Sequence, residues 1–331
     1  MPFAFPPAIL PWLVPVCAFF VCWLVLAALM RRALRLPMDH PNERSLHVTP
    51  TPRVGGIGIL VGILIGAMLI PPSALLPFMY GALILAVISL LDDYQNLPVL
   101  LRFLTHVAVA LGCLLMLPEM NGASLVLATL AIVWMTNLYN FMDGSDGLAG
   151  GMAVIGFGTL AIAAWWAGAP ELALLCAAIA AAALAFLCFN FPPAKLFMGD
   201  TGSIPLGFLA AALAFYGVVQ QYWPVLFPVM VFSPFILDAS VTLIKRGIRG
   251  EKIWRAHREH YYQRVVRLGW SHRKLALAAY ALMLACALAG LGLILAPAYA
   301  SLITSLWIAA FLLIFITLDW RWSHLKPESY K

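Results

Sequence analysis

The sequence predicts an all-α integral membrane protein that crosses the bilayer about eleven times, with ten crossings as the alternative count. The 331-residue chain is 63% hydrophobic and only 10% charged, whereas a soluble domain carries roughly a quarter charged residues. The chain also contains a series of apolar segments near the roughly 20 residues that a helix needs to cross the hydrocarbon. When these segments are threaded alternately, all 20 Lys and Arg residues fall in or beside loops on one side.

The distribution of Lys and Arg sets the expected orientation, because short loops rich in these residues face the cytoplasm. The segment from Lys245 to Lys274 contains half of the Lys and Arg residues. The charged residues of the opposite loops are only Glu119 and Glu171. We therefore expect the N-terminus outside and the C-terminus in the cytoplasm. The net charge of +6 does not require a nucleic-acid partner, since anionic lipid headgroups attract a basic cytoplasmic loop.

The apolar segments predict one polytopic domain over residues 1–331, without an appended soluble domain. The first segment is too long for a signal peptide and lacks the basic start and small-residue cleavage site, so we expect it to remain. The loops on the basic side are longer than the opposite ones, which places the active site in cytoplasmic loops. In order, the expected spans are 8–30, 54–71, 74–91, 101–118, 123–139, 148–168, 171–190, 203–219, 224–244, 274–296 and 298–319.

Two adjacent carboxylates, Asp92 and Asp93, directly follow the apolar run 82–91. Charge next to hydrocarbon is costly. The pair therefore either marks the membrane boundary or shares a cation or a proton, because like charges so close push one pKa upward.

Polar residues recur every third position in the segment that follows the fifth span: Asn137, Asn140, Asp143 and Asp146. Residues at i and i+3 share a helix face, so Asn137, Asn140 and Asp143 are expected to point together. Asp146 is expected either to cap the next helix or to join the same site.

The loop 190–203 contains groups that suit a nucleotide. Asp200, Thr201 or Ser203 is expected to cap the following helix, and a helix N-terminus suits phosphate. Asn190 begins the loop and Lys195 adds a cation. Phe197 either stacks on a base or anchors the chain at the interface.

The last basic loop contains His257, His260 and Arg264. If this loop is helical, the three side chains share one face and suit a diphosphate, because Arg donates a fork of hydrogen bonds and protonated His also donates. An amphipathic helix lying at the interface is the alternative. Zinc fits less well, since two His without a Cys partner make a poor zinc site.

The basic-side loops together offer many carboxylates but few His and no Cys. Such a donor set favours Mg²⁺, or Mn²⁺, over softer metals. Mg²⁺ is usually bound by one or two carboxylates together with substrate phosphates. The residues by themselves therefore predict metal-assisted phosphoryl chemistry at a membrane surface.

These motifs, in this order over roughly residues 40–265, resemble the polyprenyl-phosphate N-acetylhexosamine-1-phosphate transferase superfamily. They include Ser45-Leu-His-Val-Thr-Pro-Thr-Pro-Arg-Val-Gly-Gly, the Asp92–Asp93 pair and Phe197-Met-Gly-Asp-Thr-Gly-Ser. The resemblance implies transfer of an N-acetylhexosamine-1-phosphate from a UDP-sugar to undecaprenyl phosphate, with release of UMP. It also implies a multi-pass protein of the bacterial cytoplasmic (inner) membrane.

The resemblance assigns roles to individual residues. The implied catalytic residues are Asp92, Asp93, Asp143 and Asp146, and Asp200 with Asp93 would bind the metal. The implied nucleotide-sugar residues are Asn137, Asn140, Asn190, Phe197, Lys195, His257, His260, Arg264, His47 and Arg53. The expected partners are undecaprenyl phosphate, a UDP-N-acetylhexosamine and membrane lipids, without nucleic acid, and the oligomeric state is open between a monomer and a homodimer.

The last motif indicates the branch. The peptidoglycan branch carries three consecutive histidines, whereas this chain reads His257-Arg-Glu-His, and Tyr261-Tyr-Gln-Arg is more similar to the branch that starts O-antigen in lipopolysaccharide synthesis. The enzymatic alternative is a phospho-N-acetylmuramoyl-pentapeptide transferase. The competing non-enzymatic hypotheses are a transporter with a polar site at the bilayer midplane and a lipid-phosphate-binding protein without turnover.

Overall fold

The computed structural model describes residues 9–31, 38–39, 49–71, 74–117, 120, 122–252 and 257–325. Helices make up most of this part of the chain, and two short strands pair antiparallel. The elements are α1 (Leu10–Met30), β1 (Met38–Asp39), β2 (Thr51–Pro52), α2 (Gly55–Met68), α3 (Leu76–Gln95), α4 (Val99–Leu115), α5 (Gly122–Phe141), α6 (Leu148–Trp166), α7 (Pro170–Asn190), α8 (Asp200–Val219), α9 (Leu226–Val231), α10 (Ser233–Ile248), α11 (Tyr261–Arg267), α12 (His272–Leu295), the 3₁₀ turn η2 (Pro297–Tyr299) and α13 (Ala300–Leu325).

The prediction of an all-α membrane protein is confirmed. Within the described residues, eight helices are long and apolar enough to cross a membrane, and α2 and α4 are shorter apolar helices. Large apolar side chains such as Trp12, Met68 and Leu288 are exposed. In a bilayer these side chains face hydrocarbon, so their exposure costs nothing there.

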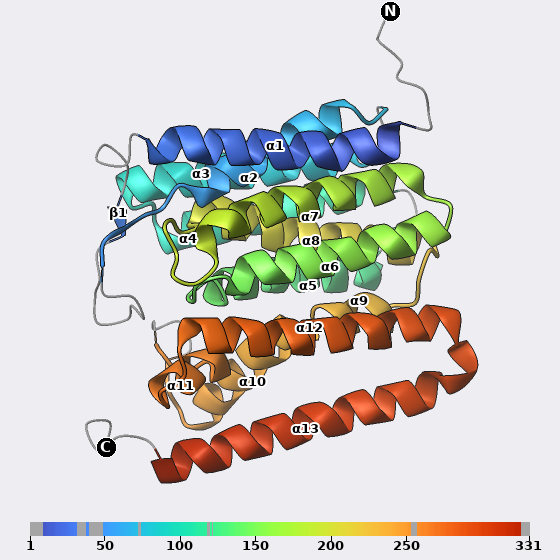
Figure 1. Ribbon diagram of the computed structural model, residues 1–331. Coiled ribbons are helices and arrows are strands. Elements are labelled where there is room, and N and C mark those ends of the chain that lie inside the picture. Colours follow the sequence, from blue (N-terminus) through green and yellow to red (C-terminus); the bar gives the residue numbers. More distant parts are fainter. Residues whose placement is uncertain are drawn as a thin grey trace, which may run out of the picture.

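The long helices lie side by side and run back and forth, as Figure 1 shows. The strands, helix α11 and the C-terminal end of α13 therefore gather at one end of the bundle, on the left of Figure 1. The α3–α4 connection lies at this end as well. The alternate threading thus brings together loops that are far apart in the sequence.

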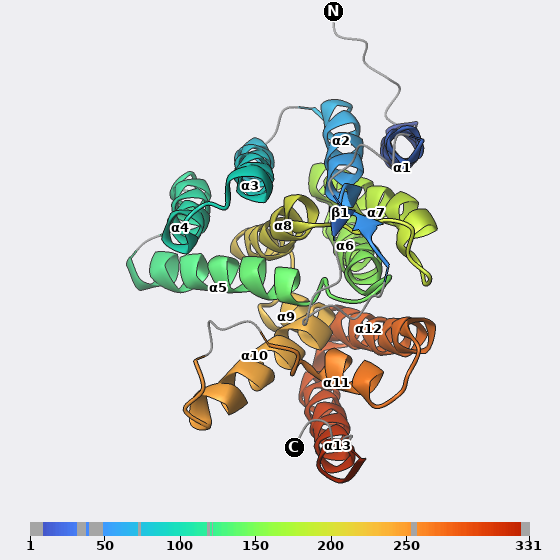
Figure 2. The same cartoon turned by 90° about the vertical axis from the view of Figure 1, so that its left-hand side faces the viewer.

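Helix α8 forms the centre of the molecule, and Figure 2, which looks along the bundle, shows it among α2, α3, α5 and α6. Of the residues in its apolar 18-residue stretch, 72% are buried, and Phe208, Leu209 and Leu213 are fully enclosed. Helix α13 is the opposite case, because only 6% of the residues in its apolar 18-residue stretch are buried. The N-terminal end of α8 therefore begins the most buried of the eight long helices.

The expected ninth span, 224–244, is wrong as one continuous helix. The chain breaks between α9 and α10 at Phe232, and α10 then continues to Ile248. The physical cause is Pro234 at the start of α10. Proline has no backbone N–H and disfavours helical geometry in the residue before it.

Three helix boundaries differ from the prediction and change the position of polar residues. Helix α3 continues to Gln95, so Asp92 and Asp93 lie in its last turn rather than after it. Helix α8 begins at Asp200, with Gly199 as its N-cap. Helix α13 continues to Leu325 and therefore includes Asp319. Polar residues near a helix end continue the backbone hydrogen bonding, although hydropathy alone does not reveal this.

Candidate active site

The side chain of Arg53 lies at the centre of a carboxylate cluster. Its Nη2 atom lies 3.2 Å from Asp200 Oδ1 and 3.9 Å from Asp93 Oδ1, and its Nη1 atom lies 3.9 Å from Asp39 Oδ1. The four residues come from β1, the residue after β2, the end of α3 and the start of α8. One guanidinium thus meets carboxylates from three segments that are distant in sequence.

Backbone hydrogen bonds hold the Arg53 segment against the loop before α8. The N–H of Phe197 donates to the carbonyl of Pro52 at 2.8 Å, and the N–H of Gly55 donates to the carbonyl of Phe197 at 2.8 Å. Gly56 then lies directly against Gly202, where a side chain on either residue would overlap backbone atoms of the other. This close approach of α2 and α8 fixes Arg53 opposite Asp200.

The two adjacent aspartates have different partners. Asp92 accepts a hydrogen bond from Arg102 Nη1 at 2.5 Å and another from the N–H of Leu97 at 2.8 Å. Both bonds tie it to the α3–α4 connection. Asp93 instead faces Arg53. Asp93 therefore pairs with Arg53 and Asp92 with Arg102 of α4, while Asp92 and Arg102 both lie close enough to Asp200 to shift the pKa of Asp200.

Asn140 and Asp143 reach the same cluster from the end of α5. Asn140 Oδ1 accepts a hydrogen bond from Ser203 Oγ at 2.6 Å, which joins α5 to the first turn of α8. Burial, followed by the charge of Asp200, raises the pKa of Asp143 well above its ordinary value of 3.8. Asn137 lies toward α4 instead, because its amide nitrogen is 3.5 Å from His106 Nδ1 of that helix; it also donates to the carbonyl of Val133. The expectation that all three share one direction is therefore wrong for Asn137.

Asn190 and Asp146 join two loops to each other. The buried Asn190 accepts from the N–H of Gly147 at 2.8 Å and donates to the carbonyl of Leu196 at 2.9 Å. Asp146 accepts from the N–H of Ala194 at 3.0 Å, so it does not cap α6. These bonds use both polar atoms of Asn190, so its amide holds the loops rather than facing a ligand.

The His257–Arg264 segment is not one helical face, because α11 begins only at Tyr261. His257 is half-buried, and burial together with the neighbouring His260 lowers its pKa to about 4. It is therefore neutral at neutral pH, unlike the protonated donor that the sequence suggests. His260 is buried beside Asp238, and the buried Arg264 donates to Asp319 Oδ1 at 3.0 Å.

The remaining predicted residues differ in accessibility. Phe197 is half-buried at the Arg53 segment, and Lys195 is exposed. His47 lies outside the described residues. The predicted roles of all these residues in binding remain predictions, but Phe197 and Asp200 lie only three positions apart, beside the Arg53 segment.

The donor set fits a hard divalent cation that would also use substrate oxygens. Within the described part of the chain, no three His, Cys, Asp or Glu side chains are arranged for metal binding by themselves. However, Asp39, Asp93, Asp143 and Asp200 outnumber Arg53, and the charge of Asp200 adds to burial in raising the pKa of Asp143. Two carboxylates plus phosphate oxygens are the usual ligands of Mg²⁺.

Sequence reasoning missed three acidic residues that the structure gives clear partners. Asp39 reaches Arg53 from β1, Asp238 accepts from the N–H groups of Tyr261 and Tyr262, and Asp319 binds Arg264. Asp238 and Asp319 fall inside predicted apolar spans. A lone acidic residue in such a span is expensive and usually functional or paired, so this signal was available for both.

Comparison with known proteins shows which proteins the chain resembles. The model of glycosyl transferase family 4 matches residues 75–218. A probable undecaprenyl-phosphate N-acetylglucosaminyl 1-phosphate transferase of Bacillus subtilis is 31% identical over 73% of each chain. A decaprenyl-phosphate N-acetylglucosaminephosphotransferase of Mycobacterium tuberculosis is 32% identical over 73% of this chain and 72% of its own.

A third relative comes from the peptidoglycan branch. The phospho-N-acetylmuramoyl-pentapeptide-transferase of Staphylococcus saprophyticus is 28% identical over 72% of this chain and 82% of its own. The region matched by the family model, residues 75–218, contains the Asp92–Asp93 pair, the end of α5 and the start of α8. The chain combines many apolar helices with a polar cluster at one end of the bundle, and it is a multi-pass membrane enzyme of hexosamine-phosphate transfer. It belongs to glycosyl transferase family 4, within the superfamily of polyprenyl-phosphate N-acetylhexosamine-1-phosphate transferases.

Proposed function

We propose that this protein transfers N-acetylhexosamine-1-phosphate from a UDP-sugar to undecaprenyl phosphate at the cytoplasmic face of the bacterial inner membrane. An oxygen of the lipid phosphate attacks the β-phosphorus of the UDP-sugar. The bond from that phosphorus to the UMP oxygen breaks, UMP leaves, and a lipid-diphosphate-linked sugar remains in the membrane.

The observation that carries this proposal is the meeting of Asp39, Asp93 and Asp200 around Arg53, with Asp143 beside them. Two anionic substrates repel each other, so phosphoryl transfer needs fixed positive charge and precise positioning more than covalent chemistry. The cluster is built on the buried start of α8, and its members come from four connected segments. Such a rigid cluster suits positioning.

Mg²⁺ is the cofactor that we propose, with Mn²⁺ as the substitute. Asp200 and Asp93 would hold the ion, because their carboxylates both approach the same guanidinium nitrogen of Arg53. When bound, the ion would offset the charge of both phosphates. Asn140, which hydrogen-bonds to the side chains of both Asp200 and Ser203, would keep Asp200 oriented, and Arg53 would bind phosphate oxygens.

The geometry favours different tasks for the two adjacent aspartates. Asp93 faces the cluster, so we infer that it acts on the reacting phosphates. Asp92 is held by Arg102 and by the N–H of Leu97, so we infer that it shapes the end of α3 and the approach to Asp93. A carboxylate held by two donors keeps its direction.

An apolar cavity of about 520 Å³ lies between α10, α11, α12 and α13, and a second one of about 510 Å³ lies between α5, α8, α9 and α10. The second is lined by Met135 and Leu138 of α5, the helix that leads to Asn140 and Asp143. An isoprenoid chain in this cavity would bring its phosphate toward the aspartates. The hydrocarbon would then stay among apolar side chains.

UDP-N-acetylglucosamine is the first donor to test, because the names of two relatives specify N-acetylglucosamine. Initiation of O-antigen remains a prediction that rests on Tyr261-Tyr-Gln-Arg264 alone. A muramoyl-pentapeptide donor is the enzymatic alternative, since a relative with that name also matches. A transporter is disfavoured, because the acidic cluster lies at one end of the bundle and not at midplane.

The test measures UMP release by purified protein in detergent or in membranes. We expect release only when a UDP-N-acetylhexosamine, undecaprenyl phosphate and Mg²⁺ or Mn²⁺ are all present. Phe197→Ala should mainly raise the KM for the nucleotide sugar. Trp166→Ala, which removes an exposed aromatic ring at the opposite end of the bundle, serves as the control.

The donor panel should contain UDP-N-acetylglucosamine, other UDP-N-acetylhexosamines and the UDP-muramoyl-pentapeptide. Turnover of the last donor alone would favour the muramoyl-pentapeptide transferase. Lipid-phosphate binding without turnover of any donor would favour the binding protein. A loss of expression in Phe197→Ala with an unaltered KM would favour the interfacial anchor.

A further inference from the structure

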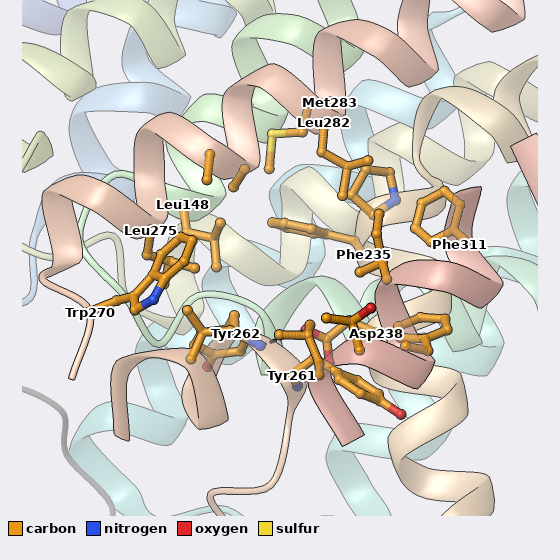
Figure 3. A pocket seen from close by; sticks show the side chains of 18 of the residues that line it. Leu148, Phe235, Asp238, Tyr261, Tyr262, Trp270, Leu275, Leu282, Met283 and Phe311 are labelled. Atoms are coloured by element: carbon orange, nitrogen blue, oxygen red, sulfur yellow. Dashed lines mark hydrogen bonds between the residues drawn. The ribbon is translucent and has the colours of Figure 1, made fainter. Parts of the chain in front are cut away.

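Helix α13 is little buried along most of its length but makes polar contacts with neighbouring helices at Trp307 and at Asp319. Only 6% of the residues in its apolar 18-residue stretch are buried. The cavity of about 520 Å³ lies between it and α10 and α12, as Figure 3 shows from close by. Phe311 of α13 lies at one side of this cavity, while Tyr261, Tyr262 and Asp238 lie together at its end. The ring centroid of Phe315 lies 4.5 Å from that of Tyr261 and Phe311 is buried, so apolar packing holds α13 at these positions but contributes little along the rest of the helix.

The contact that reaches α11 is made by Asp319, which lies near the C-terminal end of α13. It is the only acidic residue between residues 272 and 325. Its carboxylate accepts hydrogen bonds from Arg264 Nη1 at 3.0 Å, from the Tyr261 hydroxyl at 3.1 Å and from Lys245 Nζ. Lys245 belongs to α10 and the other two partners to α11. One side chain of the last helix therefore joins three helices.

Arg264 depends strongly on this contact. Its side chain is only 5% exposed, and its guanidinium lies over the rings of Tyr261 at 5.0 Å and Trp322 at 5.7 Å. Apart from Asp319, the nearest carboxylate is Glu259, at 3.8 Å. Removing one partner of a buried ion pair costs far more than removing both, because a charge is left without compensation.

Helix α11 directly follows His257 and His260, so its position sets theirs. Its N-terminal end is held by Asp238, which accepts from the N–H groups of Tyr261 at 2.8 Å and Tyr262 at 2.9 Å. Its outer side is held by Asp319. The two carboxylates thus fix α11 from α10 and from α13.

We propose that Asp319 and Arg264 are positioning residues: the α13 contact holds α11, and through α11 it holds His257 and His260 in place for the nucleotide sugar. Arg264 then acts on α11 and not on the diphosphate directly. The consequence for the nucleotide sugar rests on the proposed function, whereas the consequence for α11 does not.

Hydrogen exchange of the full-length protein in detergent, read by mass spectrometry, tests the position of α11 without any substrate. Asp319→Asn keeps the side-chain shape but removes the charge, and we expect the amides of Tyr261–Leu268 to exchange at least about fivefold faster. Ser323→Ala, an exposed position on the same end of α13, is the matched control and should leave exchange unaltered. The double variant Asp319→Asn/Arg264→Gln should exchange more slowly than Asp319→Asn alone, because no buried charge remains unpaired.

The second measurement is steady-state kinetics with each substrate varied in turn. Asp319→Asn should raise the KM for the UDP-sugar by about threefold or more and leave the KM for polyprenyl phosphate within about twofold, a split that general destabilisation would not produce. Asp319→Glu, which keeps the charge, should restore most of the difference. Exchange of α11 within about twofold of wild type, or an unaltered KM for the UDP-sugar, would overturn the proposal. If the wild type turns over no UDP-sugar, the proposed function fails, and the exchange measurement alone then decides the role of Asp319.

Discussion

The close contact between Gly56 and Gly202 gives the sharpest prediction about the cluster. A Cβ atom at position 56 would lie 2.3 Å from the Gly202 nitrogen and 2.6 Å from its Cα. Ordinary contact begins at 3.4 Å, so Gly56→Ala must move α2 and α8 apart by about 1 Å. Backbone atoms cannot rotate away as a flexible side chain can. Overpacking of this kind costs about 1–3 kcal/mol, and we expect the upper end of that range.

The same movement separates the reacting groups. Arg53 lies three residues before Gly56, and Asp200 lies two before Gly202, so their 3.2 Å contact must lengthen. A misplacement of about 1 Å in an active site can reduce turnover roughly 100-fold. The intrinsic effect of Gly→Ala in a helix has the opposite sign, because alanine stabilises a helix by about 0.5–1 kcal/mol.

Tryptophan fluorescence during thermal unfolding and UMP release together provide the assay. Gly158→Ala is the matched control, since α6 has nothing within 4 Å of a Cβ atom at that position. We expect Gly56→Ala to melt several degrees lower and to lose most activity, and the control to melt no lower than wild type. An unaltered melting temperature for Gly56→Ala, with activity within about threefold of wild type, would refute the reasoning.

Three further predictions test other parts of the site. Asn190→Ala should lower the melting temperature, because each buried backbone group left without a partner costs about 1–3 kcal/mol; a normal melt with a raised KM for the UDP-sugar would instead support direct binding. Asp200→Asn should reduce UMP release by about a thousandfold or more, and full activity with an unaltered metal requirement would contradict its role as a ligand. Burial works to raise the pKa of Glu259, but its hydrogen bond and ion pair with Arg249 outweigh this and lower the pKa below its ordinary 4.5. The pairing therefore stabilises the fold above pH 4.5 and is lost as pH falls through the lowered pKa, so the melting temperature of Glu259→Gln should fall less than that of wild type on acidification.

Hydropathy and charge placement were sufficient to predict most of the helices. An apolar segment near 20 residues long can satisfy its backbone groups in a bilayer only as a helix, so composition translates directly into structure. The break at Phe232 and the extension of α3 to Gln95 escaped this reasoning. Pro234 at a helix start and polar residues at a helix end change little in mean hydropathy, although they change where each helix begins or ends.

The sequence alone also identified Asp93, Asn140, Asp143 and Asp200 as candidates, because polar groups at the ends of apolar spans are costly. It could not separate Asp92 from Asp93. Their neighbours in sequence are the same, whereas Arg102 approaches from α4 and Arg53 from the segment between β2 and α2. It also assigned Arg264 to the diphosphate, since nothing in the local motif reveals that Asp319 lies beside it.

The sequence by itself determined that this chain spans a membrane many times, which loops carry the polar groups and which family it belongs to. Each of these properties is local, because it depends on runs of neighbouring residues. Only the tertiary structure decided which of these groups meet. A charged side chain binds a ligand, joins two loops or holds a helix in place, depending on which partner lies within about 4 Å of it. In this fold such partners lie up to 147 residues apart in the chain, as Arg53 and Asp200 do.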